Sequence, residues 1–380
     1  MLPEGWERLP IKDACSDIID CVNKTAPVVD FVTPYRMIRT TNVRNGRVDT
    51  QDVRYVTQDT YTQWTKRGTP QNGDLIFTRE APVGEAGILK DAQGVFLGQR
   101  TMMYRANPKK SSNLFLFYSL ESPFCKKQID DLSNGGTVAH MRVPDCGEII
   151  INLPPLPEQK KIAAILSTWD RAIEGTEKLL ANSQQQKKAL MQQLLTGKKR
   201  LPGFTGEWEN VLLKNIALIK KGQALSSKDL MYGDYPVIAG GKTSPYTHKH
   251  FTHENVITVS ASGAYAGYVS FHSYKIWASD CSVITSRSGN NISFIYFWLS
   301  YLQNKIFSLQ SGGAQPHIYP RDLELLHIHC PPLPEQKAIA AVLTTADEEL
   351  AAHESDLSRL RQEKKALMQQ LLTGKIRVAV

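Results

Sequence analysis

Long apolar runs are absent from this 380-residue sequence, and no stretch approaches the roughly 18 residues that a membrane-spanning helix needs. Cysteine is scarce: the six residues are scattered, and no CxxC pair occurs. This scarcity argues against a zinc ribbon or a disulfide scaffold and favours a reducing compartment. The segment Met1 to Glu7 lacks the basic-then-apolar order of a signal peptide, so we expect a cytoplasmic protein with no membrane partner.

Common catalytic signatures are missing as well. We find no GxSxG, no HExxH, no glycine-rich cofactor loop after a strand, and no Asn/Asp-Pro-Pro-aromatic tetrapeptide of the kind used by adenine methyltransferases. Gly241-Lys242-Thr243 resembles the end of a phosphate-binding loop, but Pro236 stands where the first glycine is required. The alternation of His248, His250 and His253 suits one face of a strand better than a metal site. We therefore expect a chain that binds rather than catalyses, with no metal and no cofactor of its own.

What the sequence does contain is an internal repeat. Pro154–Lys160 recurs as Pro331–Lys337, and Lys187–Lys198 recurs without change as Lys364–Lys375, both at an offset of 177. Weaker matches link Trp6-Glu7 to Trp208-Glu209 and His140 to His317. The predicted organisation is a variable domain at 1–153, a helix at 154–200, a second variable domain at 201–330 and a second helix at 331–380.

Both repeated blocks predict long helices. Pro157 and Pro334 suit the first helical turn, where Glu158 and Glu335 follow and the helix macrodipole favours anions. Gly197 and Gly374 are typical helix stops. From Pro157 to Thr196 such a helix would be a rod of roughly 60 Å.

The apolar positions of these helices recur with a 3.5-residue period, which predicts a left-handed coiled coil. We expect the two helices to pair antiparallel, because a parallel pair would require the second domain to span the full rod. The alternative is two surface helices that pack separately on their own domains. The predicted seam consists of Ile162, Leu166, Trp169, Ile173, Leu180, Leu190, Leu194, Ile339, Leu343, Leu350, Leu357, Leu360, Leu367 and Leu371. Off this seam, Ile165, Leu179, Leu195 and Leu372 are candidates for an exposed docking surface.

The two variable domains are predicted to be α+β, mostly strands with late helices. Residues 74–78 and 256–260 are β-rich runs bounded by turn residues, and 114–120 and 294–309 are apolar helical stretches. The fold class is therefore two α+β domains joined by an antiparallel coiled coil, with pseudo-two-fold symmetry.

The net charge of +8 permits a polyanionic partner, but its distribution is uneven. Residues 154–200 carry 9 basic against 4 acidic residues, whereas 1–153 carry 19 against 18 and 201–330 carry 10 against 8. The basic excess thus lies mainly on the first helix. This distribution supports an alternative in which the chain is a coiled-coil adaptor whose end domains bind proteins. A third possibility, a self-contained nuclease or methyltransferase, lacks a visible catalytic constellation.

The Pro-Pro-Leu-Pro-Glu-Gln-Lys and Lys-Lys-Ala-Leu-Met-Gln-Gln-Leu-Leu-Thr-Gly-Lys blocks, present twice behind dissimilar domains, resemble the specificity subunit of type I restriction–modification systems. Tyr35–Arg39, Gly73–Ile76 and Tyr235–Gly241 are looser signatures of that family. The resemblance covers essentially the whole chain.

The resemblance implies a non-catalytic subunit that binds double-stranded DNA, with each variable domain a target-recognition domain for one half of a bipartite site. It implies that the paired helices set the spacing and dock two methyltransferase (M) subunits, which bind S-adenosylmethionine and methylate adenine. Motor-nuclease (R) subunits would complete the restriction complex.

Candidate DNA contacts lie in loops after the predicted strands, because arginine and lysine grip phosphates or guanine edges while amide side chains suit adenine. The candidates are Arg36, Arg39, Asn42, Arg44, Arg79, Arg100, Lys242, Thr243, Ser244, Tyr246, His248, Lys249 and Ser262. The loops Gly135-Gly136-Thr137 and Gly312 to Gln315 are candidates for close backbone approach to phosphate.

Overall fold

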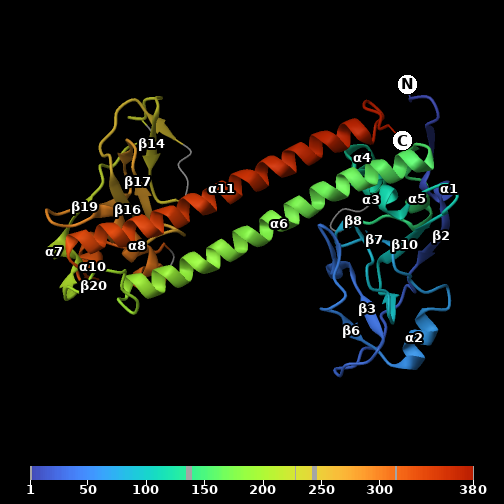
Figure 1. The fold of residues 1–380 in the computed structure, drawn as a ribbon, viewed down its shortest axis with the longest axis horizontal. Coiled ribbons are helices and arrows are strands. Elements are labelled where there is room, and N and C mark those ends of the chain that lie inside the picture. The colour runs from blue at the N-terminus through green and yellow to red at the C-terminus, as the bar shows by residue number, and fades with distance from the viewer. Residues whose placement is uncertain (1, 134–138, 227, 242–245, 313–314, 380) are drawn as a thin grey trace. The chain divides into compact units, whose positions relative to one another are not determined.

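The computed structural model describes residues 2–133, 139–226, 228–241, 246–312 and 315–379. The chain divides into two compact units: unit 1 comprises Met1–Gly175 with Leu357–Val380, and unit 2 comprises Thr176–Asp356. Two long helices, α6 (Leu156–Leu195) and α11 (Leu333–Leu371), each contribute to both units (Figure 1). The predicted fold class, two sheet-rich α+β domains with two long helices that pack together, is confirmed.

Unit 1 is built on a six-stranded sheet of order β2-β10-β7-β8-β5-β4, in which only the β5–β8 pair is parallel. Its strands are β2 (Cys15–Asp20), β10 (Thr101–Ala106), β7 (Leu75–Arg79), β8 (Val83–Ile88), β5 (Gly46–Val48) and β4 (Val43–Arg44). A three-stranded sheet β6-β3-β9 and a pair β1-β11 complete the strands: β6 (Arg54–Tyr55), β3 (Arg36–Ile38), β9 (Val95–Leu97), β1 (Glu7–Pro10) and β11 (Ile150–Leu153). The helices are α1 (Ile11–Ala14), the 3-10 turn η1 (Thr40–Asn42), α2 (Gln58–Trp64), α3 (Asn113–Glu121), α4 (Pro123–Leu132) and α5 (Val143–Gly147).

Unit 2 repeats this plan with fewer strands. Its main sheet has the order β13-β19-β16-β17, beside a three-stranded sheet β15-β14-β18 and a pair β12-β20. The strands are β13 (Ala217–Lys221), β19 (Cys281–Ser286), β16 (Val256–Ser260), β17 (Val269–His272), β15 (Thr247–His248), β14 (Tyr235–Ile238), β18 (Trp277–Ala278), β12 (Glu209–Leu212) and β20 (His327–Cys330). The helices are α7 (Leu213–Ile216), α8 (Ile292–Tyr301), α9 (Gln303–Phe307) and α10 (Pro320–Glu324).

The two units match element by element although their sequences differ. β3 pairs antiparallel with β6 and parallel with β9, just as β14 pairs antiparallel with β15 and parallel with β18. The order β2-β10-β7-β8 in unit 1 corresponds to β13-β19-β16-β17 in unit 2. The late helices α3 and α8 are apolar on several faces and are mostly buried, as expected for core helices.

The long helices are part of both hydrophobic cores. In unit 1, Ile162 and Leu166 near the start of α6 belong to the same core cluster as Met368 and Leu371 near the end of α11. In unit 2, the end of α6 and the start of α11 meet in the same way through a core cluster that includes Leu194 and Leu343. The pairing is therefore antiparallel within each unit, and the alternative of separately packed helices does not hold.

The predicted seam residues all lie partly or wholly out of solvent. Seven are buried: Ile162, Leu166, Leu194, Ile339, Leu343, Leu357 and Leu371. The other seven are half-buried: Trp169, Ile173, Leu180, Leu190, Leu350, Leu360 and Leu367. Each fully buried leucine or isoleucine contributes about 1.5–3 kcal/mol relative to an exposed one.

The expectation for the off-seam residues is partly wrong. Leu195 and Leu372 are 1% and 6% exposed and belong to the cores of unit 2 and unit 1, because the last turns of both helices pack onto the sheet domains. Ile165 is half-buried against the core of unit 1. Leu179 alone of the four is exposed, at 53%.

The repeated Pro-Glu-Gln at the helix starts ties each long helix to its unit. Glu158 accepts from the indole N–H of Trp6 at 3.1 Å and from Arg377 at 2.7 and 2.8 Å. Gln159 accepts from the backbone N–H of Ser112, the N-cap residue of α3, at 3.1 Å. Both side chains are almost fully buried, at 1% and 0% exposed. The acidic residue of the first turn thus has specific partners as well as a favourable place in the helix dipole.

Unit 2 contains the same contacts at the repeated positions. Glu335 accepts from the indole N–H of Trp208 at 3.1 Å and from Arg200 at 2.6 Å through both Nε and Nη2. Gln336 accepts from the backbone N–H of Asn291, the N-cap residue of α8, at 2.8 Å. The recurrence of these blocks in the sequence therefore reflects one structural connection that is made twice.

Candidate nucleic-acid interface

Four loop segments of unit 1 converge beside the start of β10, and we name them loop cluster 1: residues 39–42, 79–82, 98–100 and 140–141. Backbone hydrogen bonds hold them together: Gly98 N–H to Ile38 O at 2.8 Å, Arg79 N–H to Arg100 O at 2.9 Å, and Met141 N–H to Arg79 O at 2.9 Å. Three of the six predicted DNA contacts of this unit lie here: Arg39 directly follows β3, Arg79 is the last residue of β7, and Arg100 directly precedes β10.

Unit 2 builds the same arrangement, loop cluster 2, from residues 239–241, 261–263, 279–281 and 316–318. The equivalent bonds run from Ser279 N–H to Ile238 O at 2.7 Å, from Ala261 N–H to Asp280 O at 3.1 Å, and from Ile318 N–H to Ala261 O at 2.9 Å. The two clusters share this backbone frame, the set of matched hydrogen bonds, although the segment before β19 is one residue shorter than the segment before β10. Matched positions are therefore assigned from the hydrogen bonds and the strand registers.

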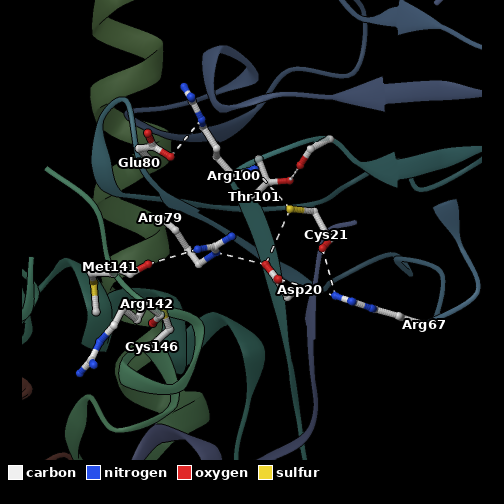
Figure 2. Close-up of polar contacts among 11 residues, drawn as sticks. Asp20, Cys21, Arg67, Arg79, Glu80, Arg100, Thr101, Met141, Arg142 and Cys146 are labelled. Atoms are coloured by element: carbon white, nitrogen blue, oxygen red, sulfur yellow. Dashed lines mark hydrogen bonds and ion pairs between the residues drawn. The ribbon is translucent and has the colours of Figure 1, made fainter. Parts of the chain in front are cut away.

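Asp20, the last residue of β2, is the centre of the polar network beside loop cluster 1. Figure 2 shows its carboxylate between Arg79 and Arg67. Arg79 donates from Nε to Asp20 at 3.1 Å and from Nη1 to Met141 O at 3.1 Å, and its side chain is 14% exposed. Arg67 donates to the carbonyl of Cys21 at 3.1 Å, and burial together with Asp20 raises the pKa of the Cys21 thiol. Arg79, a predicted DNA contact, therefore uses its donors to hold segments of the cluster together.

Arg100 is the outward-facing cation of loop cluster 1. Its Nε lies 3.0 Å from Oε2 of Glu80, and its side chain is 44% exposed. Figure 2 shows the guanidinium extending alongside Glu80, away from Arg79 and Asp20. The backbone of Arg100 has a φ of +73°, a left-handed conformation that costs free energy for a residue other than glycine.

Arg36 and Arg44, two further predicted DNA contacts of unit 1, donate hydrogen bonds to backbone carbonyls. Arg36 donates to the carbonyls of Gln93 and Thr50 and pairs with Asp91 at 2.9 Å, which lowers the pKa of the Asp91 carboxyl. Arg44 donates to the carbonyls of Thr40 and Val43 at 2.7 and 2.8 Å.

Asn42 and Arg39 lie at the loop after β3. Asn42 is 4% exposed, donates to Asp52 O at 2.6 Å and accepts from the backbone N–H of Arg39 at 2.9 Å, so it supports the loop from inside. The Nε of Arg39 is buried and has no hydrogen-bond partner among the residues that the structure describes.

In unit 2, Lys242, Thr243 and Ser244 lie outside the described residues, as does part of the loop from Gly312 to Gln315. The whole loop Gly135-Gly136-Thr137 of unit 1 also lies outside them. Tyr246 is 56% exposed and Lys249 is exposed, so both remain predicted contacts. His248 is 1% exposed and its ring lies 4.3 Å from that of Trp277, which makes it a support for the loop. Ser262 donates its hydroxyl to Oδ2 of Asp280.

Sequence reasoning missed three residues that lie in or beside these clusters: Asp20, Glu80 and Asp280. Asp20 is the last residue of β2, Glu80 follows β7 and Asp280 precedes β19, and no motif in the sequence singles them out. No group of His, Cys, Asp or Glu able to hold a metal ion is found among the described residues. Within the same residues, none of the helices is both long enough and apolar enough to span a membrane.

A family model described as the type I restriction modification DNA specificity domain matches residues 3–182 and 205–360. The chain belongs to this family. Its role is therefore DNA recognition, and it is a specificity subunit rather than an enzyme. Both matched segments include a loop cluster and the start of one long helix.

Two known relatives match 83% or more of the chain. The chain is 27% identical to the type I restriction enzyme MjaX specificity subunit of Methanocaldococcus jannaschii, over 99% of this chain and 95% of that protein. It is 26% identical to the MjaVIII specificity subunit of the same organism, over 83% and 85%. The crystal structure of a type I restriction–modification S subunit from M. genitalium has the same fold, with a TM-score of 0.70, 19% identity and coverage of 97% and 96%.

Proposed function

We propose that unit 1 and unit 2 of this specificity subunit each read one half of a bipartite, asymmetric double-stranded DNA site. The observation that carries the proposal is the presence of the same backbone frame in both units with different side chains at matched positions. Because both units have the same backbone arrangement, each can approach the same groove of DNA in the same way. Their different side chains would then recognise different bases.

The long helices are proposed to act as spacer and as docking surface for two methyltransferase subunits. Because each helix is anchored in both cores, a change in helix length would be transmitted to both units. S-adenosylmethionine would be bound by the methyltransferase subunits, which methylate adenine, and motor-nuclease subunits would join them in the full complex. The exposed Leu179 is one apolar element of the docking surface.

The test of recognition is adenine-methylation mapping of host DNA with the methyltransferase subunit present, with and without this chain. We expect a gapped, two-part motif that appears only with the chain. The absence of any new motif, despite a soluble complex of chain and methyltransferase, would contradict the proposal.

The alternative, a coiled-coil adaptor that binds proteins, has no support in the comparisons with known proteins. Salt dependence separates it from DNA recognition, because release of counterions from DNA makes affinity fall steeply with salt. Affinity of the chain–methyltransferase complex for a duplex carrying the motif should fall about tenfold or more between 50 and 200 mM salt.

The spacer role is tested by shortening both helices together. The pairs Asp170–Lys364 and Lys187–Asp347 fix the antiparallel register within each unit, and by this register residues 175–181 match residues 353–359. Deletion of both seven-residue blocks preserves the heptad pattern and removes about 10 Å of helix. We expect an unspecified spacer about 3 base pairs shorter, at roughly 3.4 Å per base pair, with both half-sites unchanged. An altered half-site would argue against a pure spacer.

A further inference from the structure

We propose that the position held by Arg100 in unit 1 and by Asp280 in unit 2 is the base-reading position that makes the two half-sites differ. In unit 1 it would take the acceptor edge of a guanine, and in unit 2 an exocyclic amino group in the major groove. The proposal rests on the proposed function and assigns the chemistry of two bases to two named residues.

The equivalence of the two residues follows from hydrogen bonds. The carbonyl of Arg100 accepts from Arg79 N–H, and the carbonyl of Asp280 accepts from Ala261 N–H, at 2.9 and 3.1 Å. Each residue stands directly before the matched strand, β10 or β19. Each side chain also pairs with the residue that follows the bonded amide: Arg100 with Glu80, and Asp280 with Ser262.

Polarity at these positions is reversed between the units while the frame is retained. Glu80 corresponds to Ser262, and the cation Arg100 corresponds to the anion Asp280. By the strand registers, Asp20 opposite Met102 corresponds to Lys221 opposite Ser282, another exchange of sign.

Behind the loops, Phe77 and Val259 are both fully buried and apolar, so the difference is confined to the loop side. The ion pair of unit 1 is thus replaced in unit 2 by a hydroxyl–carboxylate hydrogen bond on the same set of backbone hydrogen bonds.

Each pairing leaves the outer part of the side chain for DNA. Glu80 holds Arg100 through Nε, the side chain of Arg100 is 44% exposed, and Figure 2 shows the end of its guanidinium extending past Glu80, away from Arg79 and Asp20. Its terminal N–H groups can therefore meet the O6 and N7 acceptors of guanine. Ser262 occupies Oδ2 of Asp280, and a carboxylate oxygen accepts from the amino group of cytosine or, with weaker preference, of adenine.

The segment after β14 approaches Asp280 closely. A Cβ added at Gly240 would lie 2.8 Å from Ser262 O and 3.5 Å from Oδ2 of Asp280, so a larger residue would have to displace this backbone. Glycine therefore lets residues 239–241 pack directly against the Ser262–Asp280 pair.

The experiment compares methylation motifs and competition binding for Arg100→Ala, Asp280→Asn and the wild-type chain, each in complex with the methyltransferase subunit. We expect Arg100→Ala to lose roughly 5- to 150-fold discrimination at one guanine of the first half-site only. Asp280→Asn should relax or change one position of the second half-site only, and whether cytosine or adenine is lost there identifies the amino group. Arg142→Ala is the matched control, since Arg142 is 69% exposed beside the cluster and pairs with Asp145. It should leave both half-sites unchanged.

Arg100→Lys is a second variant that tests the proposal even if the alanine variant misfolds. It keeps the positive charge beside Glu80 and removes the bidentate contact to guanine. Loss of discrimination in Arg100→Lys supports the proposal. Full discrimination in a folded Arg100 variant, or equal loss in both half-sites, would overturn it. If the wild-type chain directs no two-part motif at all, the proposed function itself fails, and this outcome is distinct from either result.

Discussion

Trp6 and Glu158, 152 positions apart in the chain, are joined by a hydrogen bond of 3.1 Å from the indole N–H to the carboxylate. Trp208 makes the same bond to Glu335, also at 3.1 Å. Arg377 and Arg200 complete the two sites, and hydrogen bonding to these carboxylates raises the pKa of each guanidinium. One buried carboxylate in each unit thus fixes three segments. These are the start of the sheet domain, the start of one long helix and the segment that follows the other long helix.

We expect Glu158→Ala to destabilise unit 1 and Glu335→Ala to destabilise unit 2. Removal of Glu158 leaves the buried N–H of Trp6 without its acceptor, which costs about 1–3 kcal/mol. Proteolysis rates of the two units, read from the fragment pattern under native conditions, distinguish the variants. Equal destabilisation of both units by either variant would contradict the assignment.

A second prediction concerns the ion pairs between the helices. Lys364 pairs with Asp170 in unit 1, where Asp170 also accepts from the hydroxyl of Tyr118 at 2.6 Å. A double-mutant cycle with Asp170→Asn and Lys364→Met should give a coupling free energy of about 0.5–2 kcal/mol, because the lysine is largely buried. The exposed pair Lys127–Asp131 is the control and should couple by less than about 0.5 kcal/mol. Equal coupling in both pairs would show that burial adds nothing here.

Acid should destabilise unit 2 through His272. Burial lowers the pKa of this imidazole to about 4, and its Nε2 lies 2.8 Å from the hydroxyl of Thr258. The unfolded chain, with a histidine pKa of about 6.5, binds the proton first as pH falls, so stability is present above that pH and is lost between about 6.5 and 4. The loss should be roughly 1–3 kcal/mol in denaturant titrations. His272→Gln should remove most of it, leaving the smaller contribution of His253, whose pKa burial also lowers.

Two glycine-to-alanine substitutions should change the stability of the chain in opposite directions. Gly175 lies within α6 with no atom within 4 Å of an added Cβ, so Gly175→Ala should stabilise the chain by roughly 0.5–1 kcal/mol. Gly94 has a φ of +65° and an added Cβ would lie 1.8 Å from Pro34 O, so Gly94→Ala should destabilise unit 1 by roughly 2 kcal/mol or more. Thermal unfolding of both variants checks the prediction, and destabilisation by Gly175→Ala would refute its first half.

The sequence predicts the local elements well where one physical signal dominates. The run at 74–78 forms β7, the run at 256–260 forms β16, and the stop glycines Gly197 and Gly374 adopt φ of +71° and +73°. β-branched runs and helix-ending glycines act through their nearest neighbours, so their effect can be recognised without tertiary structure.

The site is less predictable, because an arginine has several uses that sequence does not separate. Arg36 and Arg44 stand in the predicted loops, yet their donors satisfy backbone carbonyls. Asp280 is unremarkable in the sequence and becomes notable only when the strand registers place it where Arg100 stands in the other unit. Matched positions of the two units can be compared only when the strand pairings are known, and these pairings join segments that are far apart in the sequence.

The division of the two long helices between the units has a consequence for the order in which a ribosome can complete them. Unit 2 is one continuous segment ending at Asp356, whereas the core of unit 1 requires Met368, Leu371 and Leu372. During synthesis the first domain to emerge is therefore the last to be finished. Until then, Ile162 and Leu166 lack their partners from α11, which leaves an apolar helix face open to misassembly or chaperone binding while unit 2 can already fold.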